Sequence, residues 1–277
     1  METSFKSNFR VLKGIFVKDM KYALRNPGRI MLVFILPYLL TVMVGAMGKF
    51  LGGAGSVTNF AEKTGTTNAF EYQVLGASMW VVSWVTIDRI GSTLREERIF
   101  GTLEQAYLAP INRFLMLVGM ALVQFITTGL TFLAVVVLSI LVVGGGSAIG
   151  LIQAFLILSL GLIPLFGISF IFAGLVVRFK EPQGFVSIVN LVFSILMGTY
   201  YPISVLPYWA QFASRLLPQT YALDAMRLIL LSNASLAGLY GHYIILLIMA
   251  IAYPLIGFTV FKLYLEKARV TGDLSRF

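Results

Sequence analysis

The residues best suited to act on a partner lie in a polar stretch between two apolar ones, which ends at Pro110. Gly101 interrupts this stretch, Thr102 is a favourable helix N-cap, and Gln105 three residues later completes a capping box. Leu103–Ala109 then provides about two helical turns before the proline ends them. Because charged residues separate this short helix from the apolar stretches, the pattern predicts a helix that docks in a groove of another protein.

The side chains of this stretch fall into two groups. The apolar side chains suited to filling a groove are Leu103, Tyr107 and Leu108. The charged side chains suited to setting the register by charge pairing are Glu97, Arg98 and Glu104. The alternative is an ordinary cytoplasmic loop whose arginines follow the positive-inside rule. The residues alone leave both interpretations open.

A second region combines prolines with aromatic residues. Pro202, Pro207 and Pro218 fall within seventeen residues and exclude one continuous spanning helix, yet the stretch stays apolar. Two short helices that dip into the outer leaflet satisfy both facts. Four aromatic side chains would then lie at the depth of the interface: Tyr200, Tyr201, Tyr208 and Trp209. Asp224 and Arg227 lie three residues apart and can pair on one helix face. The alternative is an outside loop with an aromatic belt.

The composition indicates which solvent surrounds these regions. Hydrophobic residues make up 58% of the 277 residues, and charged residues make up 12%. The mean hydropathy is +0.88. A soluble domain averages roughly 45–50% apolar residues and about 25% charged residues. The excess arrives in long blocks, which predicts a protein embedded in lipid. The net charge of +9 resides in residues that flank the blocks, so membrane topology explains it better than nucleic acid does.

Six apolar blocks predict an all-α integral membrane protein with six transmembrane helices. The blocks are Ile30–Gly48, Tyr72–Ile87, Phe114–Val143, Ile149–Val177, Phe185–Ile203 and Tyr243–Phe261. A bilayer core needs about 20 helical residues. The second block is short and is expected to extend into its flanks, and Pro164 is expected to kink the fourth.

The segment before these blocks has a helical period of its own. Between Phe5 and Arg25 apolar residues recur every three or four positions, and basic residues fill the other side. The sequence shows no soluble domain on which this helix could pack. We therefore expect an amphipathic interface helix on the membrane surface, with a helix of a small cytoplasmic domain as the alternative.

The basic residues also predict the orientation. If the six blocks alternate, seventeen of the 21 Lys and Arg residues fall on the side of the N-terminus and four fall on the other. The positive-inside rule then makes the first side cytoplasmic and places both termini inside.

Motifs that the chain lacks narrow the function further. It has no P-loop motif, no cysteine and a single histidine, His242. The six blocks hold no Asp, Glu, Lys, Arg or His, whereas ion-driven transporters usually need such a group within the membrane. A secondary transporter or channel, and a membrane enzyme or scaffold, are therefore the weaker hypotheses. If the protein does work, the energy must come from a partner.

The first polar stretch resembles the signature of type-2 ABC transporter permeases, the ABC-2 family. The family pattern E-R-x-x-G-T-L-E, followed by a proline, is present here, and Ala109 stands where the family commonly has Thr. The resemblance implies a cytoplasmic coupling helix that contacts a nucleotide-binding subunit. The residues implied are Glu97, Arg98, Gly101, Thr102, Leu103, Glu104, Tyr107 and Pro110.

The proline-rich region is similar to the same family. The order of Tyr201-Pro202, Leu206-Pro207 and Pro218 matches, although Leu217 replaces a usual Asn. The resemblance implies re-entrant helices between spans five and six that cap the path and gate release. The residues implied are Tyr200, Tyr201, Pro202, Pro207, Pro218, Tyr221, Asp224 and Arg227.

The resemblance extends over residues 1–277 and implies a single transmembrane domain. Its expected parts are an interface helix (1–29), a six-span region (30–265) and a cytoplasmic tail (266–277). It implies a cell-membrane permease that is not itself an enzyme and binds no cofactor, because ATP and Mg are used by a partner ATPase. A second permease copy, identical or different, and membrane lipid complete the implied assembly. The expected cargo is hydrophobic or amphipathic and moves outward, with a lipid-linked polysaccharide as the alternative.

Overall fold

The computed structural model describes residues 2–53, 56–99, 113–143, 148–178, 183–232, 234 and 236–270. All regular secondary structure in these residues is helical. The helices are α1 (Glu2–Arg25), α2 (Pro27–Gly52), α3 (Ser56–Thr64), α4 (Ala69–Ile99), α6 (Arg113–Val143), α7 (Ala148–Arg178), α8 (Gln183–Leu196), α9 (Tyr208–Ser214), α10 (Pro218–Ser232) and α11 (Tyr240–Val270), with 3-10 turns at Ile203–Val205 and Leu236–Leu239. The predicted all-α fold is confirmed.

Within the described residues, four helices are long and apolar enough to cross a membrane. Their apolar parts are Met31–Gly52 in α2, Leu117–Leu141 in α6, Ile149–Val176 in α7 and Tyr240–Lys267 in α11. They coincide with the first, third, fourth and sixth predicted blocks. Helix α7 continues through Pro164, and α11 continues through Pro254.

The second and fifth predicted blocks correspond to helices of another kind. Helix α4 is 31 residues long, as the short second block required, but it carries many polar residues. Several of these are buried, including Gln73, Ser78, Ser83 and Thr86. They face protein, so α4 does not need a uniformly apolar surface. Helix α8 offers only Val186–Leu196 as a described apolar stretch. The count of six spans therefore stays a prediction.

The core of the bundle lies around α4 and α7, and α7 makes its most extensive contact with α11. Glycines allow these two backbones to touch. A Cβ atom on Gly257 would lie 2.0 Å from the carbonyl oxygen of Gly167, and one on Gly167 would lie 2.2 Å from the backbone of Tyr253. Small residues at helix crossings let membrane helices approach closely and gain dispersion energy.

Helix α1 packs on α6, where Leu12 and Ile15 lie against Gly119. The helix therefore packs on a candidate membrane span and not on a soluble domain. Its other face is basic, with Lys13, Lys18 and Lys21 exposed. Contact of this exposed face with the membrane surface stays a prediction.

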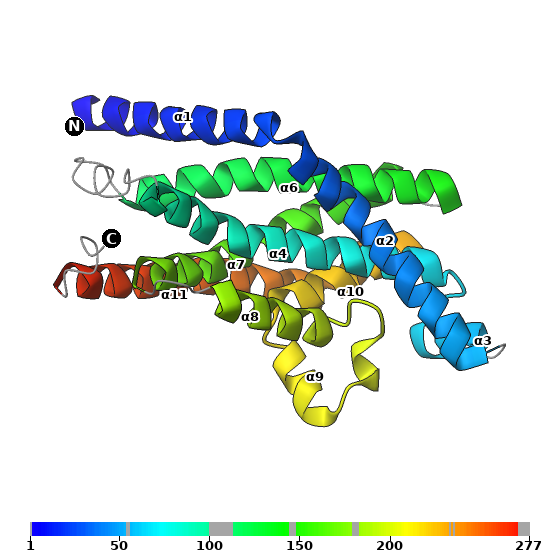
Figure 1. Ribbon diagram of the computed structural model, residues 1–277. Helices are drawn as coiled ribbons and strands as arrows, with labels where there is room; N and C mark the ends of the chain where they lie inside the picture. Colours follow the sequence, from blue (N-terminus) through cyan, green and yellow to red (C-terminus); the bar gives the residue numbers. More distant parts are fainter. Residues whose placement is uncertain are drawn as a thin grey trace.

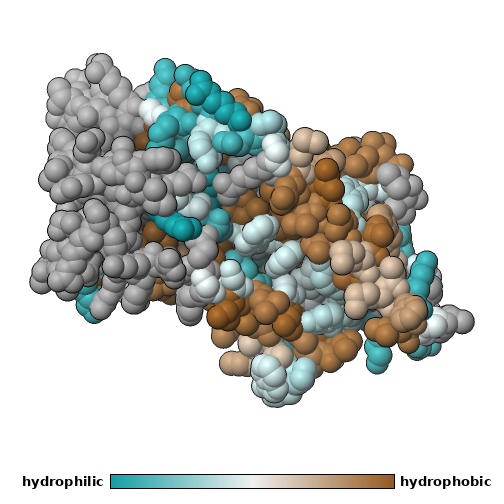
Figure 2. Space-filling view, viewed as in Figure 1, coloured by the Kyte–Doolittle hydropathy of each residue, from teal (hydrophilic) through white to brown (hydrophobic). Residues whose placement is uncertain are grey.

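Figure 1 shows the bundle with α1 and the last turns of α11 at the same end. This end also holds the ends of α4 and α6 that flank residues 100–112. In Figure 2 hydrophilic residues gather over α1 and again around α3, and a hydrophobic surface lies between them. This order is typical of a protein that passes through a bilayer.

The glycine contact yields a test of the packing. Replacing Gly257 with Ala should destabilise the protein by about 1–3 kcal/mol, because the added methyl group overpacks the α7–α11 crossing. The matched control is Gly48→Ala in α2, where no atom lies within 4 Å of the added Cβ. The thermal midpoint in detergent should fall for the first variant only. Equal midpoints would contradict the close backbone contact.

Candidate functional site

The proline-rich region folds into the two helices that the sequence predicts, α9 and α10, with a 3-10 turn before them. Each proline lies where a helix begins. Pro202 precedes the 3-10 turn, Pro207 precedes α9, and Pro218 is the first residue of α10. A proline is tolerated there because the first backbone N–H groups of a helix have no partner within it.

Arg227 of α10 holds this region to the rest of the bundle. Its side chain is 6% exposed. Nη1 donates a hydrogen bond to the carbonyl oxygen of Gly198 (3.0 Å), and Nη2 donates to those of Thr199 (2.8 Å) and Tyr72 (3.2 Å). The guanidinium also lies 3.5 Å from the centroid of the Tyr72 ring, which is a cation–π contact. Arg227 therefore joins α10, the turn after α8 and α4.

Gly76 makes this arrangement possible. A Cβ atom there would lie 1.7 Å from the carbonyl oxygen of Thr199 and 2.6 Å from Nη2 of Arg227. Gly76 is one helical turn after Tyr72, so the missing side chain leaves the Tyr72 carbonyl open to a second donor. Any larger residue would separate α4 from the turn and from the guanidinium.

The turn after α8 has the backbone geometry that presents its carbonyl groups to Arg227. Gly198 adopts a φ of +67°, which favours glycine. The hydroxyl of Thr199 donates to the carbonyl oxygen of Ser194 (2.8 Å), and the hydroxyl of Tyr201 donates to that of Ile195 (2.8 Å). Both bonds satisfy carbonyl groups at the end of α8.

Helix α10 lies deeper in the bundle than a surface loop would. Gln219 is fully buried and donates to the carbonyl oxygen of Gly161 in α7 (3.1 Å). A Cβ atom on Gly161 would lie 2.9 Å from Cβ of Ala222, so these helices are also in close contact. The hydroxyl of Tyr253 in α11 donates to the carbonyl oxygen of Leu216 just before α10.

The other predicted residues of this region occupy varied positions. Pro218 is buried, Pro207 is exposed, and five are partly buried: Tyr200, Tyr201, Pro202, Tyr221 and Asp224. Nη1 and Nη2 of Arg227 donate to three backbone carbonyl oxygens, and these bonds hold the guanidinium in place.

Helix α9 projects from the bundle in Figure 1. Its aromatic side chains are largely exposed: Tyr208 (88%), Trp209 (72%) and Phe212 (66%). Exposed aromatic residues on an apolar surface are typical of the membrane interface.

The predicted coupling residues cannot be placed in the same way. Six of them lie outside the described residues: Gly101, Thr102, Leu103, Glu104, Tyr107 and Pro110. Glu97 and Arg98 belong to the last turn of α4, and only their backbone is described. The structure therefore shows which helix leads to this segment and leaves its role a prediction.

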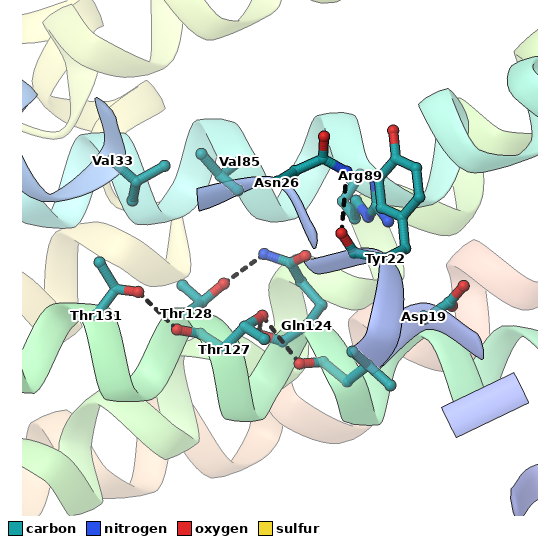
Figure 3. A pocket seen from close by; sticks show the side chains of 11 residues that line it. Asp19, Tyr22, Asn26, Val33, Val85, Arg89, Gln124, Thr127, Thr128 and Thr131 are labelled. Atoms are coloured by element: carbon teal, nitrogen blue, oxygen red, sulfur yellow. Dashed lines mark hydrogen bonds between the residues drawn. The ribbon is translucent and has the colours of Figure 1, made fainter. Parts of the chain in front are cut away.

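A pocket between α1, α2, α4 and α6 is a feature that the sequence did not indicate. It holds about 60 Å³ of water-accessible space and is lined mainly by polar residues. Gln124, Thr127, Thr128 and Thr131 follow one face of α6, and Figure 3 shows Tyr22, Asn26 and Arg89 across from them. The guanidinium of Arg89 lies 4.7 Å from the centroid of the Tyr22 ring. The helical spacing of Gln124, Thr127 and Thr131 is the signal that could have revealed this face.

The Arg227 contacts yield a second test. Arg227→Lys should lower stability by roughly 2–3 kcal/mol, because an ammonium lacks the fork that reaches three carbonyl groups. Gly76→Ala should do the same by separating α4 from the turn. Arg215→Lys, at an exposed position, is the control. Hydrogen exchange of residues 197–201 should speed up in the first two variants, and unchanged protection there would rule out this role for Arg227.

Comparison with known proteins agrees with this architecture. The model of the family described as ABC-2 family transporter protein matches residues 53–259, about three quarters of the chain. None of the curated proteins compared with the chain matches it. Members of this family are transport components without an ATPase domain of their own, and they normally pair with an ABC ATPase subunit. Together with the apolar helices, the match identifies a multi-pass membrane component of an ABC transporter. The chain belongs to the ABC-2 family of transporter proteins.

Proposed function

We propose that the chain is the permease of an ATP-driven exporter that moves a hydrophobic or amphipathic substrate outward. A separate ATPase would dock on residues 97–110, and a second permease copy would complete the path. The observation that carries this proposal is the continuity of α4, which runs from the Arg227 contacts at one end to the predicted docking segment at the other.

Helix α4 can carry a movement between these two places. Its 31 residues span about 46 Å. Its central part is buried among the other helices, so it would move against them as one rigid rod. A displacement at Ile99, produced when the ATPase binds ATP, would thus reach Tyr72 and the turn at Gly198. Tyr200, Tyr201 and Asp224 adjoin this turn or α10 and would then act in an outer gate.

The orientation is part of the proposal. We infer that α1 and the last turns of α11 lie in the cytoplasm of a cell-membrane protein and that α3 lies outside. The positive-inside rule supports this orientation. The exposed basic residues at this end are Lys13, Lys18 and Lys21 on α1 and Lys262 and Lys267 on α11. Helices α9 and α10 would then enter the outer leaflet as re-entrant elements, and α4 and α8 would be the remaining two spans.

A charge reversal tests the docking segment. Glu104→Arg should abolish co-purification of an ABC ATPase with the detergent-solubilised protein, because it replaces an acidic side chain of the docking helix with a basic one. Glu62→Arg makes the same change on the exposed surface of α3, at the opposite end of the bundle, and should leave the ATPase bound. Retention of the ATPase by both variants would refute docking at residues 97–110.

The absence of native cysteine allows a direct test of topology. In intact cells a membrane-impermeant maleimide should label Lys63→Cys on α3 and should label Lys21→Cys on α1 only after the membrane is permeabilised. Both positions are exposed in the structure. The reverse pattern would invert the orientation, and with it the direction of export.

A further inference from the structure

The polar pocket between α1, α2, α4 and α6 adjoins an apolar groove. The groove lies between α2 and α6, offers about 300 Å³ and is lined by Met31, Phe34, Leu130, Thr131 and Ala134. Thr131 lines both spaces. Together the pocket and the groove extend about 15 Å along α6, from Gln124 to Ala134. The two spaces adjoin at Thr131, and we call them together the crevice. Most residues that line the pocket are polar, and most that line the groove are apolar.

The polar part of this crevice offers several hydrogen-bond acceptors. The hydroxyl of Thr127 donates to the carbonyl oxygen of Val123 (2.9 Å), and that of Thr131 donates to the carbonyl oxygen of Thr127 (2.7 Å). Each hydroxyl has one proton, so its oxygen is left as an acceptor. The amide nitrogen of Gln124 donates to the hydroxyl of Thr128, as Figure 3 shows.

Asn26, the residue that precedes α2, contributes a second amide to the pocket. Its amide nitrogen donates to the carbonyl oxygen of Tyr22 (2.9 Å). Each of the two amides, Asn26 and Gln124, keeps a carbonyl oxygen as an acceptor. A ligand head that donates hydrogen bonds can use these oxygens.

The charged residues of the pocket add a second requirement. Asp19 is 5% exposed and lies 3.8 Å from Lys18, and Arg89 brings a guanidinium to the same lining. One carboxylate and one guanidinium therefore contribute to the wall. A head group that carries both an ammonium and an anionic group matches this pair better than a head of either single charge.

The order of the two spaces identifies the class of ligand. A polar head in the pocket and a hydrocarbon tail in the groove would lie parallel to α6, as a lipid of the α1-side leaflet does. We propose that this crevice binds an amphiphile from that leaflet, with a hydrocarbon tail and a head that combines a primary ammonium with an anionic group. The inference rests on the proposed function, because it names the class of substrate that the exporter would accept.

A single-cysteine protection assay tests the crevice. Thr131→Cys in the cysteine-free chain is reconstituted in phosphatidylcholine nanodiscs and modified with N-ethylmaleimide. Palmitoyl lysophosphatidylethanolamine and palmitoyl lysophosphatidylcholine are the probes. They share the tail, the glycerol hydroxyl and the net charge, but only the first carries N–H donors on its head group. The ethanolamine probe should slow modification by at least about threefold, the change at twice its Kd, and the choline probe should slow it less.

Two further variants separate the crevice from unspecific effects. Leu255→Cys, on an exposed apolar position of α11, should be modified at the same rate with and without probe. Ala134→Phe, added to Thr131→Cys at an exposed position of the groove, should fill the groove without disturbing the core and should remove the protection.

Several results would overturn the proposal. The first is equal slowing of the modification by both probes, and the second is slowing at Leu255→Cys. The third is no slowing at Thr131→Cys, and the fourth is protection that survives Ala134→Phe. A disulfide between two Thr131→Cys chains before any probe is added would mean that a second copy covers the groove. The assay contains no ATPase, so its failure leaves the docking test with Glu104→Arg standing, and failure of that test leaves amphiphile binding measurable.

Discussion

The buried guanidinium of Arg227 is the constraint on which the packing of α10, α4 and the turn after α8 depends. A cation in this position needs acceptors, since an isolated buried charge is strongly unfavourable. Backbone carbonyl groups meet that need, and they come from two segments distant in sequence, at Tyr72 and at Gly198–Thr199. One side chain thus fixes the relative positions of three elements. The left-handed Gly198 and the missing side chain of Gly76 are the local conditions that bring those carbonyl groups within reach.

Close backbone contacts extend this organisation through the bundle. Glycines bring α4 to the turn after α8, α7 to α10, and α7 to α11. Between lipid-exposed helices there is little hydrophobic driving force, so dispersion at such crossings supplies much of the cohesion. Helix α4 has a different means of stabilisation, because its hydroxyl and amide groups are buried against protein. As an isolated helix in lipid it would be poorly stabilised, so it depends on the helices around it. The same polar groups lower its mean hydropathy, so a hydropathy criterion does not select it as a span.

The sequence was sufficient to predict the elements whose signals are local. The apolar blocks predicted α2, α6, α7 and α11, and the prolines predicted two short helices in place of one continuous span. The signature motif indicated the family that the family model then matched. Contacts between segments that are distant in the sequence could not be predicted in this way. Arg227 was singled out together with Asp224, its neighbour in sequence, whereas its hydrogen-bond partners lie 28, 29 and 155 residues away. The packing of α1 on α6 and the polar pocket were missed for the same reason, because each depends on surfaces that meet only in the fold.

The central claim is that α4 transmits the state of the ATPase to the Arg227 contacts. Hydrogen exchange of residues 197–201 in the purified permease–ATPase complex, with and without a non-hydrolysable ATP analogue, tests it most directly. The account predicts that exchange in this segment changes when the nucleotide binds and that Gly76→Ala, which separates α4 from the turn, abolishes the change. Identical exchange with and without nucleotide, in a complex that still transports its substrate, would contradict the account.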